Sequence, residues 1–424
     1  MSKIDDLIKE HCPDGVEFTA LNTLLDYAQP TKYIAKSTKY DEGFSTPILT
    51  AGDSFILGYT NETDGVYNAG KKNPVIIFDD FTTSFHWVDF NFKVRSSAMK
   101  MITPKDGVNF KYVYYAMKNI QYTPSSHARH WISKYSNFEI PFPPLPVQQE
   151  IVTILDKFTK LEAELETELE ARQRQYAYYR DSLLSFDEIG GIVERESVRW
   201  RVLGEVGEFI HGGDSFYLRK EDLLNSGVGC IHYGEIYTHY GLYAYQTKSF
   251  IPESIARKLK KAKKRDLIIT TAGRSGQSIG KAVAWLGDEE IVTSNHACIY
   301  RHSLNPRYVA HFFMTNEFQR QKKQCVVGSL SRHLYIKDMS KIKIPIPPPE
   351  EQVRIADILD KFEVLTNDAK SGIAAGLAAR QQQYEHYRNF LFKPLVSQEG
   401  ATTFDTRNDD TMTTLENEQL ELDI

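Results

Sequence analysis

Two stretches of the sequence carry hydrophobic residues at alternating spacings of three and four, the pattern of a helix that packs along one seam. They occupy residues 148–186 and 350–392, and both are rich in Leu, Glu, Ala, Arg and Gln, which favour helix. A proline-rich segment precedes each stretch and stops the preceding element. The spacing predicts two long helices that pack on each other. Their seams include Phe158, Tyr176 and Tyr179 in the first and Phe362, Tyr384 and Tyr387 in the second.

The rest of the sequence has a different pattern. Residues 16–140 and 198–344 are rich in Tyr, Phe, Gly and Thr. Short apolar runs, such as 74–78 and 266–271, are separated by turn-forming residues, as expected for buried strands. The pattern predicts two mixed α/β domains, each followed by one long helix.

The chain repeats itself. The segment IPFPPLPVQQEIVTILDKF at 140–158 returns as IPIPPPEEQVRIADILDKF at 344–362, with 11 of 19 positions identical. ARQRQYAYYRDSLL at 171–184 returns as ARQQQYEHYRNFLF at 379–392, with eight of 14 identical. Weaker matches pair Val16, Phe18 and Leu21 with Val198, Trp200 and Leu203, and Arg129, His130 and Lys134 with Arg332, His333 and Lys337. One unit is therefore written twice.

The two strong matches differ in offset, 204 against 208 residues, so the second helix contains four additional residues. A four-residue insertion keeps the seam on one side and straightens the supercoil locally. Gly372 and Gly376 lie in this part of the second helix and predict a close approach of its backbone to the first. Core packing alone also accounts for the seam.

The N-terminal sequence IDDLI precedes the first domain much as RDSLL precedes the second. We therefore expect the first residues to dock where the second long helix ends, which would close the architecture into a ring with pseudo-two-fold symmetry. The expected fold is α+β, with segments 1–15 (N-terminal segment), 16–146 (first domain), 147–188 (first helix), 189–349 (second domain), 350–393 (second helix) and 394–424 (acidic, disordered tail).

The composition is that of ordinary globular material, with 41% hydrophobic and 25% charged residues in a chain of 424. The four cysteines are isolated from one another, which argues against disulfides and against a zinc site. The first residues, MSKIDDLIKEHCPDG, contain no signal-peptide pattern. These features predict a cytoplasmic protein with reduced thiols.

The net charge of −5 is unevenly distributed. Residues 397–424 contain one Arg and eight acidic residues, and residues 150–188 contain five basic and ten acidic residues, so the remainder is near +7. The densest basic run is 257–265, where seven of nine residues are Lys or Arg. Its apolar residues Leu259 and Ala262 predict an amphipathic helix that contacts phosphates; a solvated helix surface is the alternative.

Catalytic motifs are missing from the sequence. The stretch AGRSGQSIGKA at 272–282 contains a Gly-Lys pair, but its glycine spacing and Ala282 do not fit a phosphate-binding P-loop. The 12 histidines show no metal-ligand spacing, and no run of the kind that DNA amino-methyltransferases use around the target base is present. We therefore predict no catalytic residue and no metal site.

The paired proline-rich segments with their LDKF endings, the AGRSGQSIGKA loop and the two Arg-His-x3-Lys elements resemble the specificity (S) subunit of type I restriction-modification systems. The resemblance covers nearly the whole chain. It implies two target recognition domains that each read half of an asymmetric bipartite DNA sequence, separated by an antiparallel coiled coil. It also implies two methyltransferase subunits that bind S-adenosylmethionine and motor-nuclease subunits that use ATP and Mg²⁺, with no cofactor on this chain and no membrane partner.

Candidate DNA contacts are polar and basic residues that follow strands or repeat between the domains, since base reading needs donors and acceptors held by phosphate contacts. Ordinary turn chemistry is the alternative for each. In the first domain they are Lys71, Lys72, Thr82, Thr83, Ser84, His86, Arg129, His130 and Lys134; in the second they are Lys258, Lys260, Lys261, Lys263, Lys264, Arg274, Ser275, Gln277, Ser278, Lys281, Arg332, His333 and Lys337.

Two other functions remain open from the sequence. One is a coiled-coil scaffold whose two domains bind ligands other than DNA. The other is a self-contained restriction and methylation enzyme. Salt-dependent DNA binding would exclude the scaffold, and methylation by the isolated chain would support the enzyme.

Overall fold

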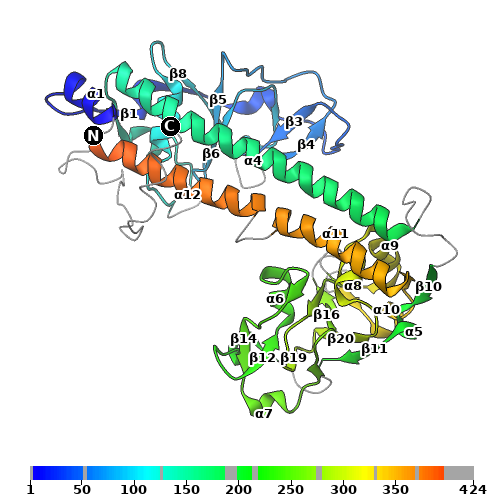
Figure 1. Ribbon diagram of the computed structural model, residues 1–424. Coiled ribbons are helices and arrows are strands. Elements are labelled where there is room, and N and C mark those ends of the chain that lie inside the picture. Colours follow the sequence, from blue (N-terminus) through cyan, green and yellow to red (C-terminus); the bar gives the residue numbers. More distant parts are fainter. Residues whose placement is uncertain are drawn as a thin grey trace. The chain divides into compact units, whose positions relative to one another are not determined.

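The computed structural model describes residues 3–50, 55–124, 128–186, 198–212, 218–273, 279–328, 332–367 and 372–395 (Figure 1). The chain divides into two compact units, the first comprising residues 1–163 with 379–424 and the second residues 164–378. Each unit therefore contains one α/β domain and a part of both long helical stretches. None of the described helices is long and apolar enough to cross a membrane.

The first unit is built on a four-stranded antiparallel sheet in the order β2-β8-β5-β6 and a three-stranded sheet in the order β4-β3-β7. Its central strand β5 buries the apolar run that begins at Val75. Asn109 caps helix α3 by accepting from the Tyr112 amide. The elements are α1 (Lys3–His11), β1 (Phe18–Ala20), α2 (Leu21–Leu24), β2 (Leu25–Ala28), η1 (Pro30–Tyr33), β3 (Thr46–Leu49), β4 (Ile56–Thr60), β5 (Val75–Asp79), β6 (Phe85–Val88), β7 (Lys93–Val94), β8 (Met99–Pro104), α3 (Phe110–Met117), η2 (Tyr135–Asn137) and β9 (Glu139–Pro141).

The second unit repeats this plan with a five-stranded sheet, β11-β20-β16-β18-β13, and a four-stranded sheet, β14-β12-β19-β15. A small additional sheet has the order β17-β22-β21. The elements are β10 (Arg199–Val202), α5 (Leu203–Val206), β11 (Gly207–His211), η5 (Lys220–Asp222), β12 (Val228–Ile231), α6 (Tyr233–Thr238), β13 (Tyr243–Ala244), β14 (Ser249–Ile251), α7 (Glu253–Ala256), β15 (Lys261–Ala262), β16 (Leu267–Thr270), β17 (Ala272–Gly273), β18 (Ala282–Trp285), β19 (Ile291–Thr293), β20 (Ala297–His302), α8 (Pro306–Phe312), α9 (Asn316–Cys325), β21 (Val326–Val327), β22 (Arg332–Leu334), α10 (Ile336–Met339) and β23 (Lys343–Ile346).

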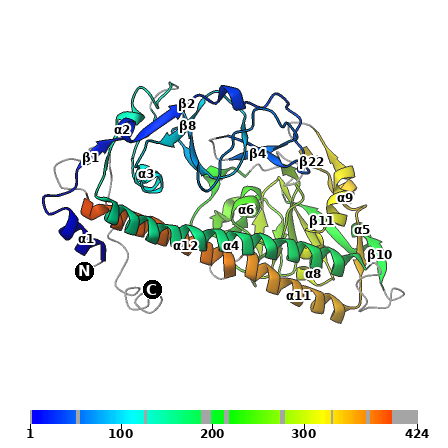
Figure 2. The ribbon, with the colours of Figure 1, turned by 90° about the horizontal axis from the view of Figure 1, so that it is seen from above.

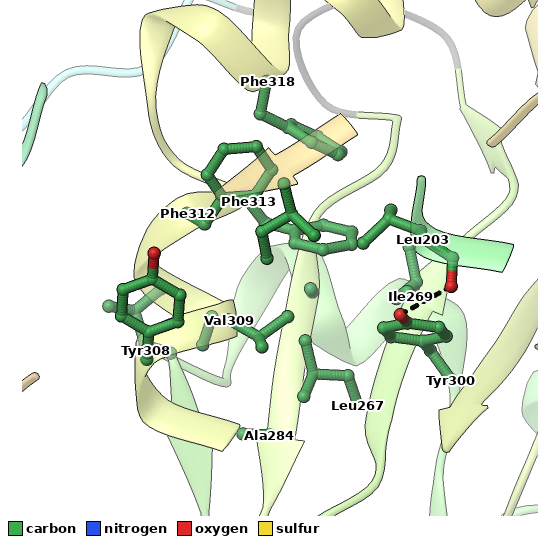
Figure 3. Close-up of a cluster of buried hydrophobic side chains, with 14 of the residues drawn as sticks. Leu203, Leu267, Ile269, Ala284, Tyr300, Tyr308, Val309, Phe312, Phe313 and Phe318 are labelled. Carbon is green, nitrogen blue, oxygen red and sulfur yellow. Dashed lines mark hydrogen bonds between the residues drawn. The ribbon is translucent and has the colours of Figure 1, made fainter. Parts of the chain in front are cut away.

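The largest hydrophobic core of the second unit lies between its main sheet and helices α8 and α9 (Figure 3). Leu267 and Ile269 of β16 point into it, and Phe312 and Phe318 from the two helices pack there. The Tyr300 hydroxyl donates to the Leu203 carbonyl at 2.9 Å, so the polar end of a buried aromatic residue is satisfied. This core fixes the sheet from which the candidate loops extend.

The repeat seen in the sequence recurs as matching strand registers. Phe18 pairs with Pro141 in the β1-β9 ladder, and Trp200 pairs with Pro345 in the β10-β23 ladder. The buried hydroxyl of Tyr112 donates to the Pro141 carbonyl at 2.6 Å, and that of Tyr308 donates to the Pro345 carbonyl at 2.8 Å. The two domains therefore join their proline-rich segments in the same way.

The long helices pack along the predicted seam. Helix α4 (Leu145–Ser185) lies beside α12 (Gly372–Phe392) in the first unit and beside α11 (Pro349–Asn367) in the second (Figure 1, Figure 2). Phe158 stacks on Tyr387 with ring centroids 4.9 Å apart, and Tyr179 stacks on Phe362 at 5.4 Å. The earlier position of α4, 158, meets the later position 387, whereas the later position of α4, 179, meets the earlier position 362. The two helical stretches therefore run in opposite directions, which confirms the antiparallel coiled coil.

The second helical stretch differs from the prediction of one helix over 350–393, because it consists of α11 and α12, with residues 368–371 between them outside the described residues. Gly372 has φ +77°, and a Cβ there would lie 2.5 Å from the Leu365 carbonyl oxygen. A Cβ on Gly376 would meet no atom within 4 Å. The predicted close approach of the helices at these glycines is therefore wrong: one starts a new helix and the other faces open space.

Helix α1 supplies the N-terminal part of the first unit. Ile4 is 1% exposed and belongs to the hydrophobic cluster that also contains Leu391, Phe392 and Leu395 from the end of α12 and the short helix η6 (Lys393–Leu395). Lys3 forms an ion pair with Glu150 of α4 at 2.7 Å. The first residues and the end of the second helical stretch thus share one core. The acidic, disordered tail was predicted to begin at residue 394, but residues 394 and 395 belong to η6, and Leu395 is buried in this core. The rest of the predicted tail lies outside the described residues.

Candidate DNA interface

The loop between β5 and β6 is the best defined candidate in the first unit. Asp79 accepts hydrogen bonds from the amides of Phe81 at 2.8 Å and Thr82 at 2.9 Å. Thr83 has φ +61° and is mostly buried, and the Thr82 and Ser84 hydroxyls are 2.7 Å apart. Through these bonds the Asp79 carboxylate, at the end of β5, folds the loop back on itself. The loop is therefore preorganised, with Thr82 exposed.

Asp80 joins this loop to the segment that follows residue 128. Its carboxylate accepts from the Trp131 amide at 2.8 Å, and its backbone carbonyl accepts from the His130 amide at 2.8 Å. The other carboxylate oxygen lies 2.9 Å from the ammonium of Lys100, and both side chains are buried. The structure therefore brings together the two candidate elements of the first domain, which are about 50 residues apart in the sequence.

The predicted contacts of the first domain occupy different environments. Arg129 and Lys134 are exposed, and the Lys134 ammonium lies 4.7 Å from the centre of the Tyr122 ring. His130 is only 5% exposed, and its Nδ1 is 2.9 Å from the Tyr122 hydroxyl, so its ring serves the interior. His86 stacks on Phe55 at 4.5 Å.

Lys71 and Lys72, two of the predicted contacts of the first domain, do not lie beside the loop that contains Thr82. Both are exposed, but they precede β5, whereas the loop follows it. A five-residue strand separates the two ends by roughly 15 Å. The two lysines and the loop therefore lie at opposite ends of one strand, and we remove both lysines from the candidate interface.

In the second unit the equivalent elements meet through backbone pairing. Strand β17 pairs with β22, which places Ala272 opposite His333 and Gly273 opposite Arg332. The Leu334 amide also donates to the Thr271 carbonyl at 2.9 Å. Arg332 and His333 are partly exposed beside the start of the predicted loop, of which Arg274, Ser275, Gln277 and Ser278 lie outside the described residues.

Two lysines next to this loop behave differently. Lys337 is exposed, and its ammonium lies 5.7 Å from the centre of the Tyr335 ring. Lys281 is half-buried and donates to the Tyr240 carbonyl at 3.1 Å, and burial lowers the pKa of its ammonium. Lys281 therefore stabilises the domain from within, whereas Lys337 remains available at the surface.

The basic run 257–265 does not form the predicted amphipathic helix. Helix α7 ends at Ala256, and Lys261 and Ala262 form strand β15, in which Lys261 pairs with Val292 of β19. Asp266 accepts from the Lys263 amide at 2.8 Å, and Arg265 has φ +81°. Pairing with a strand about 30 residues later overrides the local helical pattern. The strand pairing provides hydrogen-bond partners for the backbone N–H and C=O groups that would otherwise have bonded within a helix.

The strand divides the basic residues into two groups. Lys261 and Lys263 lie 3.3 and 3.6 Å from Glu290, and Lys264 lies 2.7 Å from Asp288. Lys258 and Lys260 precede β15 and are exposed, and the Lys260 amide donates to the Gly212 carbonyl at 3.3 Å. Carboxylates therefore partly neutralise Lys261, Lys263 and Lys264, and exposed Lys260 is the stronger candidate for phosphate contact.

Sequence reasoning missed the residues that hold these elements in place. Asp80 and Lys100 each have the appearance of an ordinary polar residue at the edge of an apolar run. The repeated LDKF segments also contribute aspartates, since Asp156 accepts from the Tyr115 hydroxyl and Asp360 accepts from His311 Nε2 at 2.8 Å. The repetition of these aspartates was a signal, but their partners are apparent only in the folded chain.

Two similar α/β domains with polar loops at one edge, joined to antiparallel helices, define a protein with two recognition modules on one scaffold. The family model described as "Type I restriction modification DNA specificity domain" matches residues 13–171 and again residues 198–378. The chain belongs to this family. The comparisons lend no support to a scaffold for ligands other than DNA.

Several known proteins are similar over most of the chain. The "Type I restriction enzyme EcoR124I/EcoR124II specificity subunit" of Escherichia coli is 38% identical over 89% of this chain and 95% of the relative. A putative type I restriction enzyme specificity subunit of Haemophilus influenzae is 27% identical over 80% of this chain and 84% of the relative. The crystal structure of an S subunit from M. genitalium superposes with a TM-score of 0.51 at 17% identity, covering 91% of this chain and 97% of that one, which supports the fold.

Proposed function

We propose that this chain is the DNA-recognition subunit of a type I restriction-modification complex and that each domain reads one half of a bipartite DNA target. The observation that carries this proposal is the repeated meeting of two elements at one edge of each domain. In the first unit Asp80 joins the Thr82 loop to the segment with Arg129, and in the second unit β17 joins the corresponding loop to Arg332 and His333. Exposed donors beside cations are what base reading and phosphate contact require.

The target is asymmetric, because the two edges differ chemically. The first presents Thr82 and Arg129, whereas the second presents Arg332, His333 and Lys337. Different donors and acceptors select different bases in the major groove. Identical half-sites would require two nearly identical edges, which this chain does not have.

We assign the catalytic chemistry to partner subunits. Two methyltransferase subunits would bind this chain and use S-adenosylmethionine to methylate adenine, and motor-nuclease subunits would use ATP and Mg²⁺ to move along DNA and cleave it. This chain would position them on their target without a catalytic residue of its own. The isolated chain is therefore expected neither to methylate nor to cleave DNA, and methyl transfer by the purified chain would contradict the assignment.

The direct test is to sequence methylated bases in cells that express this chain with its methyltransferase partner. We expect one bipartite sequence with two different halves and a fixed spacer. Exchange of residues 16–146 for the equivalent domain of a relative should change one half only. A continuous target, or a change in both halves, would contradict the two-domain proposal.

The helices are proposed to set the spacer. Glu168 and Ala375 lie midway in sequence between the two ring stacks of the seam. Four residues inserted after each position would preserve the seam and lengthen each helix by about 6 Å. Because DNA rises about 3.4 Å per base pair, the same two halves should be methylated across a spacer one or two base pairs longer. An unchanged spacer would show that the helices do not set the distance.

A further inference from the structure

Two short loops outside the predicted site lie at the same edge of the domains. Residues 95–98 connect β7 to β8 in the first unit, and residues 294–296 connect β19 to β20 in the second. Strand β7 runs parallel to β3, and β19 runs parallel to β12. Loops at the carboxyl ends of neighbouring parallel strands form the ligand-binding edge of many α/β sheets, so both loops occupy a position suited to binding.

In the first unit this loop joins the candidate edge directly. The Asp80 amide donates to the Ala98 carbonyl at 3.0 Å, and Asp80 also holds the Trp131 amide. The Arg95 amide donates to the Leu49 carbonyl at 3.1 Å, which anchors the backbone below an exposed guanidinium. Three segments therefore converge on Asp80, and the loop that contains Arg95 is one of them.

The second unit has the equivalent arrangement. The Thr271 amide donates to the His296 carbonyl at 2.8 Å, as the Asp80 amide does to Ala98. The ring of Tyr233 packs edge-on against His296 with centroids 4.9 Å apart, and the Tyr233 amide donates to the Ser294 hydroxyl at 3.0 Å. His296 is partly exposed and is held in place from two sides.

Positive charge also reaches this edge of the second unit. The Gly212 amide donates to the Ala297 carbonyl at 3.2 Å, and the Gly212 carbonyl accepts from the Lys260 amide at 3.3 Å. This chain of contacts places the start of β15, with exposed Lys260, next to the loop that ends at His296. A cation beside partly exposed donors and acceptors fits a duplex whose phosphates flank readable base edges.

We propose that residues 95–98 and 294–296 are additional DNA-reading loops, in which Arg95 contacts bases of one half-site and His296 contacts bases of the other. This inference rests on the proposed function and adds residues to its binding edge. Arg95 supplies paired donors of the kind that bind the O6 and N7 acceptors of guanine. His296 supplies one ring donor and one ring acceptor when neutral. Each residue then determines specificity in its own domain.

The test uses the full chain with its methyltransferase partner and compares binding to the specific duplex with binding to random duplex. Arg95→Ala and His296→Ala should each weaken specific binding by roughly 5- to 150-fold, the range expected for loss of a base contact, with a smaller effect on random DNA. Arg95→Lys keeps the charge and should recover random binding without recovering selectivity. Methylation sequencing should show relaxed selection in one half for Arg95→Ala and in the other half for His296→Ala.

Matched controls keep the charge or the ring type but change position. Lys105 follows the far end of β8, and exposed His239 caps the far end of the helix that begins at Tyr233. Lys105→Ala and His239→Ala should leave both half-sequences unchanged, and unfolding midpoints check that all variants are folded. Selective binding that survives both Arg95→Ala and His296→Ala would overturn this inference alone. Absence of selective binding by the unmodified chain would overturn the proposed function as well.

Discussion

The two domains share a fold but hold their candidate DNA-binding edges by different means. In the first, a buried ion pair between Asp80 and Lys100 anchors the loop after β5. In the second, Thr271 occupies the position of Asp80, and Cys298 occupies that of Lys100, as the matching strand registers show. There the small sheet β17-β22-β21 provides the anchor. A backbone ladder depends little on side-chain identity, whereas a buried ion pair fails when either partner is removed.

The junctions between the domains and the long helices differ in the same way. Asp156 accepts from the Tyr115 hydroxyl and lies 3.7 Å from the ammonium of Lys111. Asp360 is more buried and accepts from His311, Tyr243 and Arg307. Burial alone would raise the pKa of Asp360, but these hydrogen bonds outweigh it and lower the pKa. The stability of the second junction therefore depends more strongly on a single carboxylate, that of Asp360, than the stability of the first depends on Asp156.

The largest effect is expected from Lys100→Met, which leaves the Asp80 carboxylate buried and unpaired. Removal of one partner of a buried pair costs about 3–5 kcal/mol. The first unit should lose that much stability, and methylation should lose selectivity for one half-sequence. Denaturant unfolding followed by methylation sequencing measures both. The matched substitution Cys298→Ala in the second unit should cost much less, and equal losses would remove the distinction between the two anchors.

A pH effect of comparable size should be confined to the second unit. Burial lowers the pKa of His302 from its ordinary value of 6.5 to about 4. Between these values the unfolded chain binds more protons than the folded chain, so the stability is present above pH 6.5 and is lost as the pH falls to about 4. The loss approaches about 3 kcal/mol. Pro104 occupies the equivalent position in the first unit.

His302→Gln tests this expectation, because glutamine does not titrate. Its unfolding free energy, measured by denaturant titration from pH 7 to pH 4, should fall less steeply than that of the unmodified chain. Parallel curves for the two proteins would mean that His302 does not contribute to the acid sensitivity.

A smaller effect is expected at the helix junctions. Asp360→Asn should destabilise the second unit by about 1.5–3 kcal/mol, because a partly buried carboxylate that accepts a hydrogen bond from the charged Arg307 guanidinium is lost. Asp156→Asn should cost less than about 1 kcal/mol, since the Asp156 carboxylate is 48% exposed. Thermal unfolding of the two variants ranks them directly. A larger loss for Asp156→Asn would reverse the comparison of the junctions.

The smallest effect concerns the two groups of lysines around β15. Lys260→Ala should reduce the slope of log affinity against log salt by about one, the amount expected for one phosphate contact. The double substitution of Lys263 and Lys264 by Ala should change this slope less, because Glu290 and Asp288 already pair with them. Binding to random duplex over a salt series gives both slopes. Equal changes in the two slopes would mean that both groups of lysines contact phosphates.

The two-domain plan and the helical seam can be predicted from the amino-acid sequence. The repeated LDKF segments reveal the duplication, and the seam positions Phe158, Tyr179, Phe362 and Tyr387 indicate which helices pack together. These features are local periodicities and internal identities, and the ring stacks of Phe158 on Tyr387 and of Tyr179 on Phe362 follow from them. Periodicity carries this information because it reports which side of an element is buried.

The assembly of the candidate DNA-binding edges depends instead on contacts between distant parts of the chain. The basic run around Lys261 has a helical pattern, but pairing with β19 makes it a strand, and nothing near Asp80 in the sequence indicates that its partners are Lys100 and Trp131. Gly372 likewise resembles a packing residue, but its positive φ begins a separate helix. The backbone of the basic run and the charge of Asp80 both find their partners far along the chain. Local sequence patterns do not specify which distant partner satisfies such a group.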